Sequence, residues 1–125
     1  MVHSILIADD NAFVRSGLCE LFNCEPDFDV CGEAENGKEA IEEAEELHPD
    51  LILLDLSMPV MNGLDAARVL KRVMPEVPII MYSAYSDSFT EKEARSAGVT
   101  ALVSKSEPLS VLVNKSRGVV HQIAA

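Results

Sequence analysis

The stretch LILLDLSMPVMNG, residues 51–63, is the part of the chain that decides the fold. Four consecutive apolar residues predict a short strand buried on both faces, as in a parallel sheet. The run leads directly into Asp55. Because an unpaired buried carboxylate is strongly unfavourable, the sequence predicts that other groups hold Asp55 in its charged form.

The rest of the chain alternates between strand-like apolar runs and helical periods. We expect strands at residues 4–8, 28–34, 51–54, 78–82 and 101–103. We expect helices on Val14, Leu18, Leu21 and Phe22, from Gly37 to His48, over 64–74, over 88–97 and from Leu109 to Ile123. In the helix over 64–74, Ala66, Leu70, Val73 and Met74 should face inward. This order predicts one α/β domain over residues 1–125, with a doubly wound five-stranded parallel sheet and five helices.

Composition excludes several classes of protein. The net charge of −11 argues against direct nucleic-acid binding, which needs a basic surface. No apolar run is long enough to cross a membrane, and the N-terminus lacks the basic region of a signal peptide. Cys19, Cys24 and Cys31 are odd in number and show no CxxC spacing, which favours reduced thiols in a cytoplasmic protein.

Polar residues follow four of the five predicted strands. Asp9 and Asp10 follow the first strand, Asp55 the third, Ser83 the fourth and Lys105 the fifth. Ligand sites of open parallel sheets lie at the carboxyl ends of the strands. Three carboxylates predict a hard cation such as Mg²⁺, Lys105 adds a positive charge, and a carboxylate can form an aspartyl-phosphate.

These motifs resemble the response-regulator receiver domains of two-component signalling. The resemblance covers the whole chain and rests on the acid pair Asp9-Asp10, on LLDLSMPVMNG, on MYSAY and on VSKSEP. The stretch from Val30 to Lys71 is most similar to the subfamily that carries a LuxR-type helix-turn-helix effector. The resemblance implies a flavodoxin-like receiver fold with strand order 2-1-3-4-5. It also implies a signalling domain, not an enzyme, that assists only its own phosphorylation and dephosphorylation.

The resemblance also implies a role for each site residue. Asp55 would accept the phosphoryl group, and Ser83 and Lys105 would contact the phosphoryl oxygens. Mg²⁺ would be held by Asp10, Asp55 and the backbone carbonyl of Ser57, with Asp9 reaching it directly or through water. The implied phosphodonor is a histidine kinase or a phosphotransfer protein. A homodimer is possible, DNA would be reached only through a possible C-terminal domain, and no membrane partner is expected.

Two positions depart from the family pattern. Leu102 stands three residues before Lys105, where the family usually has a switch Tyr or Phe, and Ser106 stands where many members have Pro. We expect Tyr85 to be the moving side chain instead. The predicted helix over 88–97 has few apolar anchors, namely Phe89, Ala94 and Ala97.

Two other functions stay open. The first is a pseudo-receiver that binds partners without phosphorylation, which the leucine at position 102 suggests. The second is an enzyme that hydrolyses small phosphate esters through Asp55. It is disfavoured because Ser57 stands where a second catalytic acid is expected and because the chain shows no cap to enclose a substrate.

Overall fold

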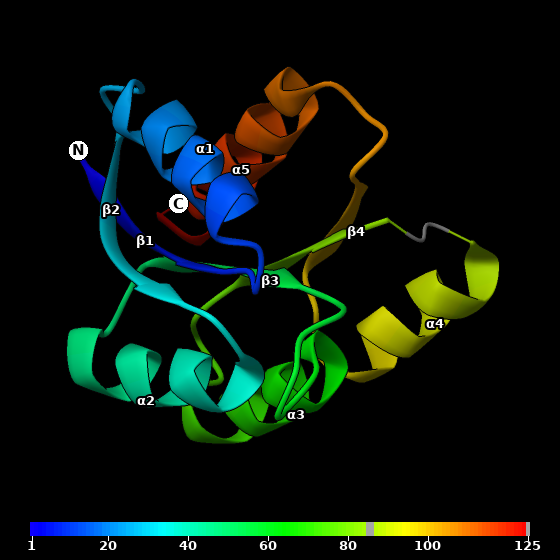
Figure 1. The fold of residues 1–125 in the computed structure, drawn as a ribbon. Coiled ribbons are helices and arrows are strands. Elements are labelled where there is room, and N and C mark those ends of the chain that lie inside the picture. Colours follow the sequence, from blue (N-terminus) through cyan, green and yellow to red (C-terminus); the bar gives the residue numbers. More distant parts are fainter. Residues whose placement is uncertain (85–86, 125) are drawn as a thin grey trace.

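The centre of the fold is one parallel sheet of five strands, in the order β2-β1-β3-β4-β5 (Figure 1). We describe residues 1–84 and 87–124 of this computed structural model. The strands are β1 (His3–Ala8), β2 (Phe28–Ala34), β3 (Leu51–Asp55), β4 (Ile79–Ser83) and β5 (Ala101–Ser104). The predicted sheet, its parallel pairing and its strand order are therefore confirmed.

Helices cover both faces of the sheet. They are α1 (Ala12–Asn23), α2 (Gly37–Leu47), α3 (Gly63–Val73), α4 (Ser88–Ser96) and α5 (Leu109–Ala124). In Figure 1, α1 and α5 lie on one face and α2, α3 and α4 on the other. This is the doubly wound arrangement that the alternation of elements predicts.

Successive residues of the central strands enter two separate cores. Ile5 and Ile7 of β1 pack on the side of α1 and α5, whereas Leu6 and Ala8 pack on the side of α2, α3 and α4. Side chains of a strand alternate between the two faces of a sheet, so a strand covered on both faces has to be apolar throughout. The four apolar residues before Asp55 in β3 are at most 1% exposed for the same reason.

The helix ends follow local signals in the sequence. Asn11, Asn36, Asn62 and Asp87 are the N-caps of α1, α2, α3 and α4, and each accepts a hydrogen bond from a backbone N–H of the first turn. Gly98, just after α4, has φ of 91°, the left-handed conformation in which a glycine commonly ends a helix.

The inward face of α3 differs from the prediction at one position. Ala66, Ala67 and Leu70 are buried, but Val73 is 49% exposed. The helix is turned so that Ala66, Ala67 and Leu70 are buried and the partly buried Met74 packs against the same core, which leaves Val73 at the margin of the apolar face. The prediction for Val73 is therefore wrong, and Ala67 occupies the inward face instead.

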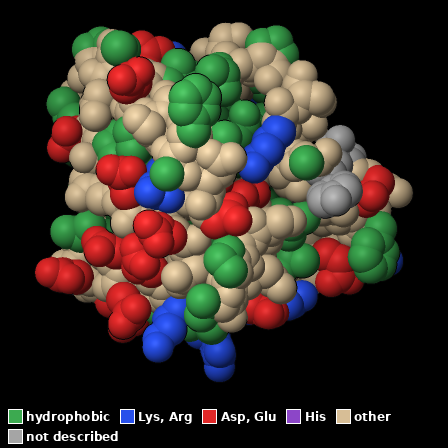
Figure 2. All heavy atoms as spheres, in the orientation of Figure 1, with side chains coloured by type: hydrophobic (Ala, Val, Ile, Leu, Met, Phe, Trp, Pro, Cys, Tyr) green, Lys and Arg blue, Asp and Glu red, His purple; other side chains and the backbone are tan. Residues whose placement is uncertain are grey.

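Helix α2 has a buried apolar face and a solvated acidic face. Ala40 and Ala44 of α2 are buried, while Glu42, Glu45 and Glu46 are exposed. In Figure 2, acidic side chains gather on the surface over α2. Among the described residues, no helix has both the length and the apolar character needed to cross a membrane.

Candidate functional site

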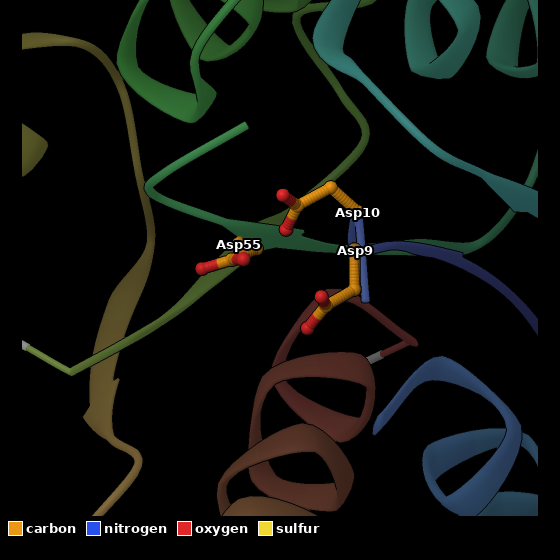
Figure 3. Close-up of side chains that lie close together, drawn as sticks. All are labelled: Asp9, Asp10 and Asp55. Carbon is orange, nitrogen blue, oxygen red and sulfur yellow. The ribbon is translucent and has the colours of Figure 1, made fainter. Parts of the chain in front are cut away.

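Three carboxylates gather at the carboxyl edge of the sheet. Asp9 and Asp10 follow β1, and Asp55 is the last residue of β3, the strand beside it. Each of the three offers an oxygen within 4.8 Å of the others (Figure 3). Asp9 and Asp55 are buried, whereas Asp10 is exposed and opens the cluster to solvent. The structure thus brings together the acids that the sequence pattern places at this edge.

Lys105 supplies the positive charge of the cluster. Its Nζ lies 3.2 Å from Asp55 Oδ1 and 3.6 Å from Asp9 Oδ2. The backbone N–H of Lys105 donates to the carbonyl of Ser83 at 2.7 Å, which fixes the loop after β5 to the end of β4. Lys105 is therefore held by backbone and side chain together.

The pKa values of Asp55 and Lys105 are both raised, for different reasons. Burial raises the pKa of Asp55, the charge of Asp9 raises it further, and Lys105 opposes both. Burial acts to lower the pKa of Lys105, but Asp55 and Asp9 outweigh it and raise that pKa overall. The ammonium therefore stays protonated, while the carboxylates repel each other and favour an additional cation.

The two oxygens of the Asp9 carboxylate differ in their hydrogen bonding. Asp9 Oδ1 accepts the backbone N–H of Asn11 at 2.9 Å. Asp9 Oδ2 is buried and has no hydrogen-bond partner within residues 1–84 and 87–124, although Lys105 is near it. A buried oxygen of this kind, beside two more carboxylates, fits a divalent cation with oxygen ligands such as Mg²⁺.

The remaining predicted site residues lie around this cluster. Ser83 ends β4 and is buried next to β3, and Ser57 is exposed in the loop after Asp55. The backbone N–H of Ser57 donates to the Asp55 carboxylate and acts to lower its pKa. Leu102 is partly buried on β5 and packs against the core under α2, α3 and α4. Tyr85, the predicted moving side chain, lies outside the described residues.

Two neighbours of the site escaped the sequence prediction. Asn11 orients Asp9 through its N–H and caps α1 with its side chain. Its position directly before a helical stripe was the available signal. Tyr82 places its ring 5.5 Å from Lys105 Nζ, in the range of a cation–π contact. In the sequence, Tyr82 appears only as one more residue of a buried strand.

Two of the three cysteines, Cys19 and Cys31, are poor nucleophiles. All three are free, as predicted. Burial raises the pKa of Cys19 to about 11, with the charge of Glu33 acting in the same direction. Burial also raises the pKa of Cys31. Both thiols therefore stay protonated at neutral pH, unlike reactive cysteines.

Comparison with known protein families assigns most of the chain to one family. A family model described as "Response regulator receiver domain" matches residues 5–117. The transcriptional regulatory protein LnrK of Bacillus subtilis is 36% identical over 109 residues, which cover 87% of this chain and 50% of LnrK. A protein-glutamate methylesterase/protein-glutamine glutaminase of Pyrococcus abyssi is 39% identical over 121 residues, 97% of this chain and 33% of that protein. The chain thus spans between a third and a half of these curated relatives.

Solved structures agree with this assignment. A LuxR-family two-component response regulator from Aurantimonas sp. SI85-9A1 superposes with a TM-score of 0.94 at 26% identity, covering 98% of this chain and 87% of that one. The response regulator domain of Thermotoga maritima CheB gives a TM-score of 0.87 at 28% identity, covering 100% and 98% of the two chains.

Proposed function

This chain belongs to the response-regulator receiver domain family of two-component signalling, and from that premise we propose that it accepts a phosphoryl group on Asp55 and thereby switches an effector. Phosphorylation of an aspartate is general in the family. One observation supports the assignment to Asp55. Its buried carboxylate lies 3.2 Å from Lys105 Nζ and clusters with Asp9 and Asp10 at the carboxyl ends of the strands.

The chemistry follows from the charges around Asp55. A carboxylate oxygen of Asp55 attacks phosphorus, and the bond from phosphorus to the donor breaks, with its electron pair leaving on the donor. Lys105, whose Nζ lies 3.2 Å from Asp55 Oδ1, would stabilise the charge of the transferred group. Asp9, Asp10, Asp55 and the Ser57 carbonyl would hold Mg²⁺, which when bound supplies neutralisation of the crowded oxygens. Ser83, at the end of the neighbouring strand, would donate a hydrogen bond to the phosphoryl group.

The proposed donor is a phosphohistidine on a histidine kinase or a phosphotransfer protein. We propose that the protein is located in the cytoplasm, because such donors act there. For the effector we favour transcriptional control, supported by the likeness to LnrK and to LuxR-family regulators. DNA would then be bound by a further domain, since the net charge of this chain is −11. Control of a methylesterase is the second candidate, because several relatives of that name are 37–50% identical to this chain.

The proposed switch runs through α4 and β5. Ala94 is the one buried residue of α4, and Phe89 on the same helix is 72% exposed, so little apolar area holds this helix. A weakly packed element has a low local stability, and a ligand can shift it between states that already exist. With Leu102 in place of an aromatic ring, we propose that α4 moves and that Leu102 stays packed against the core. Hydrogen exchange should then change across α4 and β5 when Asp55 carries a phosphoryl mimic.

The assignment to Asp55 is tested by intact mass. Incubation with Mg²⁺ and a small phosphodonor should add the mass of one phosphoryl group to the parent, and Asp55→Asn should abolish this gain. Asp50→Asn is the matched control, because Asp50 is an exposed aspartate before β3 that pairs with Ser4 at the opposite edge of the sheet. A parent that gains no mass would favour the pseudo-receiver, and labelling of Asp55→Asn would refute the assignment.

A further inference from the structure

Arg15 reaches from the first turns of α1 back to the acidic edge of the sheet. Its Nη1 donates to the backbone carbonyl of Asp9 at 2.6 Å. Its Nε donates to Glu33 at 3.0 Å, and its Nη2 lies 3.9 Å from Glu35. The side chain is only 13% exposed, so these contacts hold a largely buried guanidinium in one place. None of the motifs in the sequence singles this arginine out.

The contact matters because the direction of the Asp9 carboxylate depends on its backbone. The Asp9 N–H donates to the carbonyl of Ala34 at 3.0 Å, and Asp9 Oδ1 accepts the N–H of Asn11. The N–H of Arg15 in turn donates to the Asn11 carbonyl at 2.9 Å. Arg15 therefore holds the residues on both sides of the turn whose geometry aims Asp9 Oδ2 into the cluster.

We propose that Arg15 is a positioning residue for the cation site, acting through the backbone of Asp9. The proposal rests on the proposed function insofar as that function needs a divalent cation at Asp9, Asp10 and Asp55. Removal of a group that orients a metal ligand without contacting the metal typically weakens metal affinity about 10- to 100-fold. The guanidinium fork makes several directed contacts at once, which a lysine cannot reproduce.

The direction in which Mg²⁺ affinity changes on removal of Arg15 distinguishes a positioning role from a purely electrostatic one. Arg15 is a cation near a cation site, so if it acted only through its charge, its removal would strengthen Mg²⁺ binding. A positioning role predicts that removal of Arg15 weakens Mg²⁺ binding. Glu33 and Glu35 pair with the guanidinium and reduce its long-range effect, leaving the contact with the Asp9 carbonyl as the dominant one.

The test is a calorimetric Mg²⁺ titration of Arg15→Gln and Arg15→Lys. We expect Arg15→Gln to weaken binding about tenfold, and Arg15→Lys to weaken it also, although it keeps the charge. Arg117→Gln is the matched control, because Arg117 also bridges two acids, Asp27 and Glu25, but lies on α5 away from the cluster. It should leave Mg²⁺ affinity unchanged. In an Asp9→Asn background, Arg15→Gln should have no further effect.

A measurement without metal decides the inference independently. Amide hydrogen exchange of the metal-free protein should become faster at Asp9 and Asn11 in Arg15→Gln and stay as in the parent in Arg117→Gln. Unchanged exchange at these two amides, or Mg²⁺ affinity that is unchanged or tighter in Arg15→Gln, would overturn the role of Arg15. A parent protein that binds no Mg²⁺ would instead contradict the proposed function, while the exchange result still decides the positioning.

Discussion

Gly63, the first residue of α3, offers a direct test of how tightly the loop after Asp55 is packed. A Cβ at this position would lie 2.2 Å from the backbone oxygen of Asp55 and 3.0 Å from the Cα of Leu56. Cβ atoms essentially never come closer than 3.0 Å to another heavy atom, so Gly63→Ala has to displace the Asp55 carbonyl by about 0.8 Å. The obstacle is backbone, which cannot rotate away as a side chain can.

The displacement should affect both stability and chemistry. Overpacking of this kind costs about 1–3 kcal/mol, which for a domain of this size lowers Tm by about 4–12 °C. Because a misplacement of about 1 Å at a reacting group can cost about 100-fold in rate, labelling by a small phosphodonor should slow roughly 10- to 100-fold. Thermal unfolding by circular dichroism and timed intact-mass measurements give the two values.

Two other glycines provide the control. At Gly17 in α1 and Gly118 in α5, an added Cβ would meet no described atom within 4 Å, apart from its own helix and chain neighbours. Alanine there should stabilise the domain by about 0.5–1 kcal/mol, because it restricts the unfolded chain and favours helix. If Gly63→Ala matches Gly17→Ala in Tm and labels at the parent rate, the close packing of the Asp55 loop is refuted.

Three further predictions concern other parts of the domain. The hydrogen bond from Arg117 lowers the pKa of Asp27 below its usual 3.8, so the ionised carboxylate stabilises the fold. Asp27→Asn should therefore lower Tm at pH 7. The difference in Tm from the parent should vanish as the pH falls from 3.8 through the lowered pKa of Asp27. Val60 has φ of 68° and is 79% exposed. Val60→Asn should therefore relieve about 1 kcal/mol of strain in urea unfolding, and a loss of stability would contradict this. Asp10→Asn should weaken Mg²⁺ binding in calorimetry more than Asp9→Asn does, and equal or reversed losses would reject the direct role of Asp10.

Sheet topology and strand ends could be predicted because they depend on patterns that repeat along the chain. A buried parallel strand has to be apolar throughout, and a polar residue at its end has to face the carboxyl edge. This reasoning places Asp9, Asp55, Ser83 and Lys105 at one edge from the order of the residues alone. The family resemblance adds the strand order, which apolar runs alone do not specify.

Details that depend on packing could not be predicted. Val73 looks like a core residue in the sequence, but the register of α3 on the sheet buries Ala67 and Leu70 and leaves Val73 in solvent. The contact of Arg15 with the Asp9 carbonyl is likewise invisible, because an arginine in a first helical turn is usually a surface residue. Both depend on the angle at which a helix meets the sheet, which sequence periodicity does not encode.

The charge balance of the site bears on the proposed switch. Asp9, Asp10 and Asp55 carry three negative charges against the one positive charge of Lys105. A divalent cation would bring this set to neutrality. A phosphoryl group on Asp55 would carry about −1.5 to −2 charges in place of the single charge of the carboxylate, so it would leave a balanced site negative again. The nearest groups able to respond are Lys105 and Ser83, which the backbone hydrogen bond at 2.7 Å joins across β4 and β5. In the proposed switch, a movement of one would be transmitted to the other, and through β5 to the lightly anchored α4.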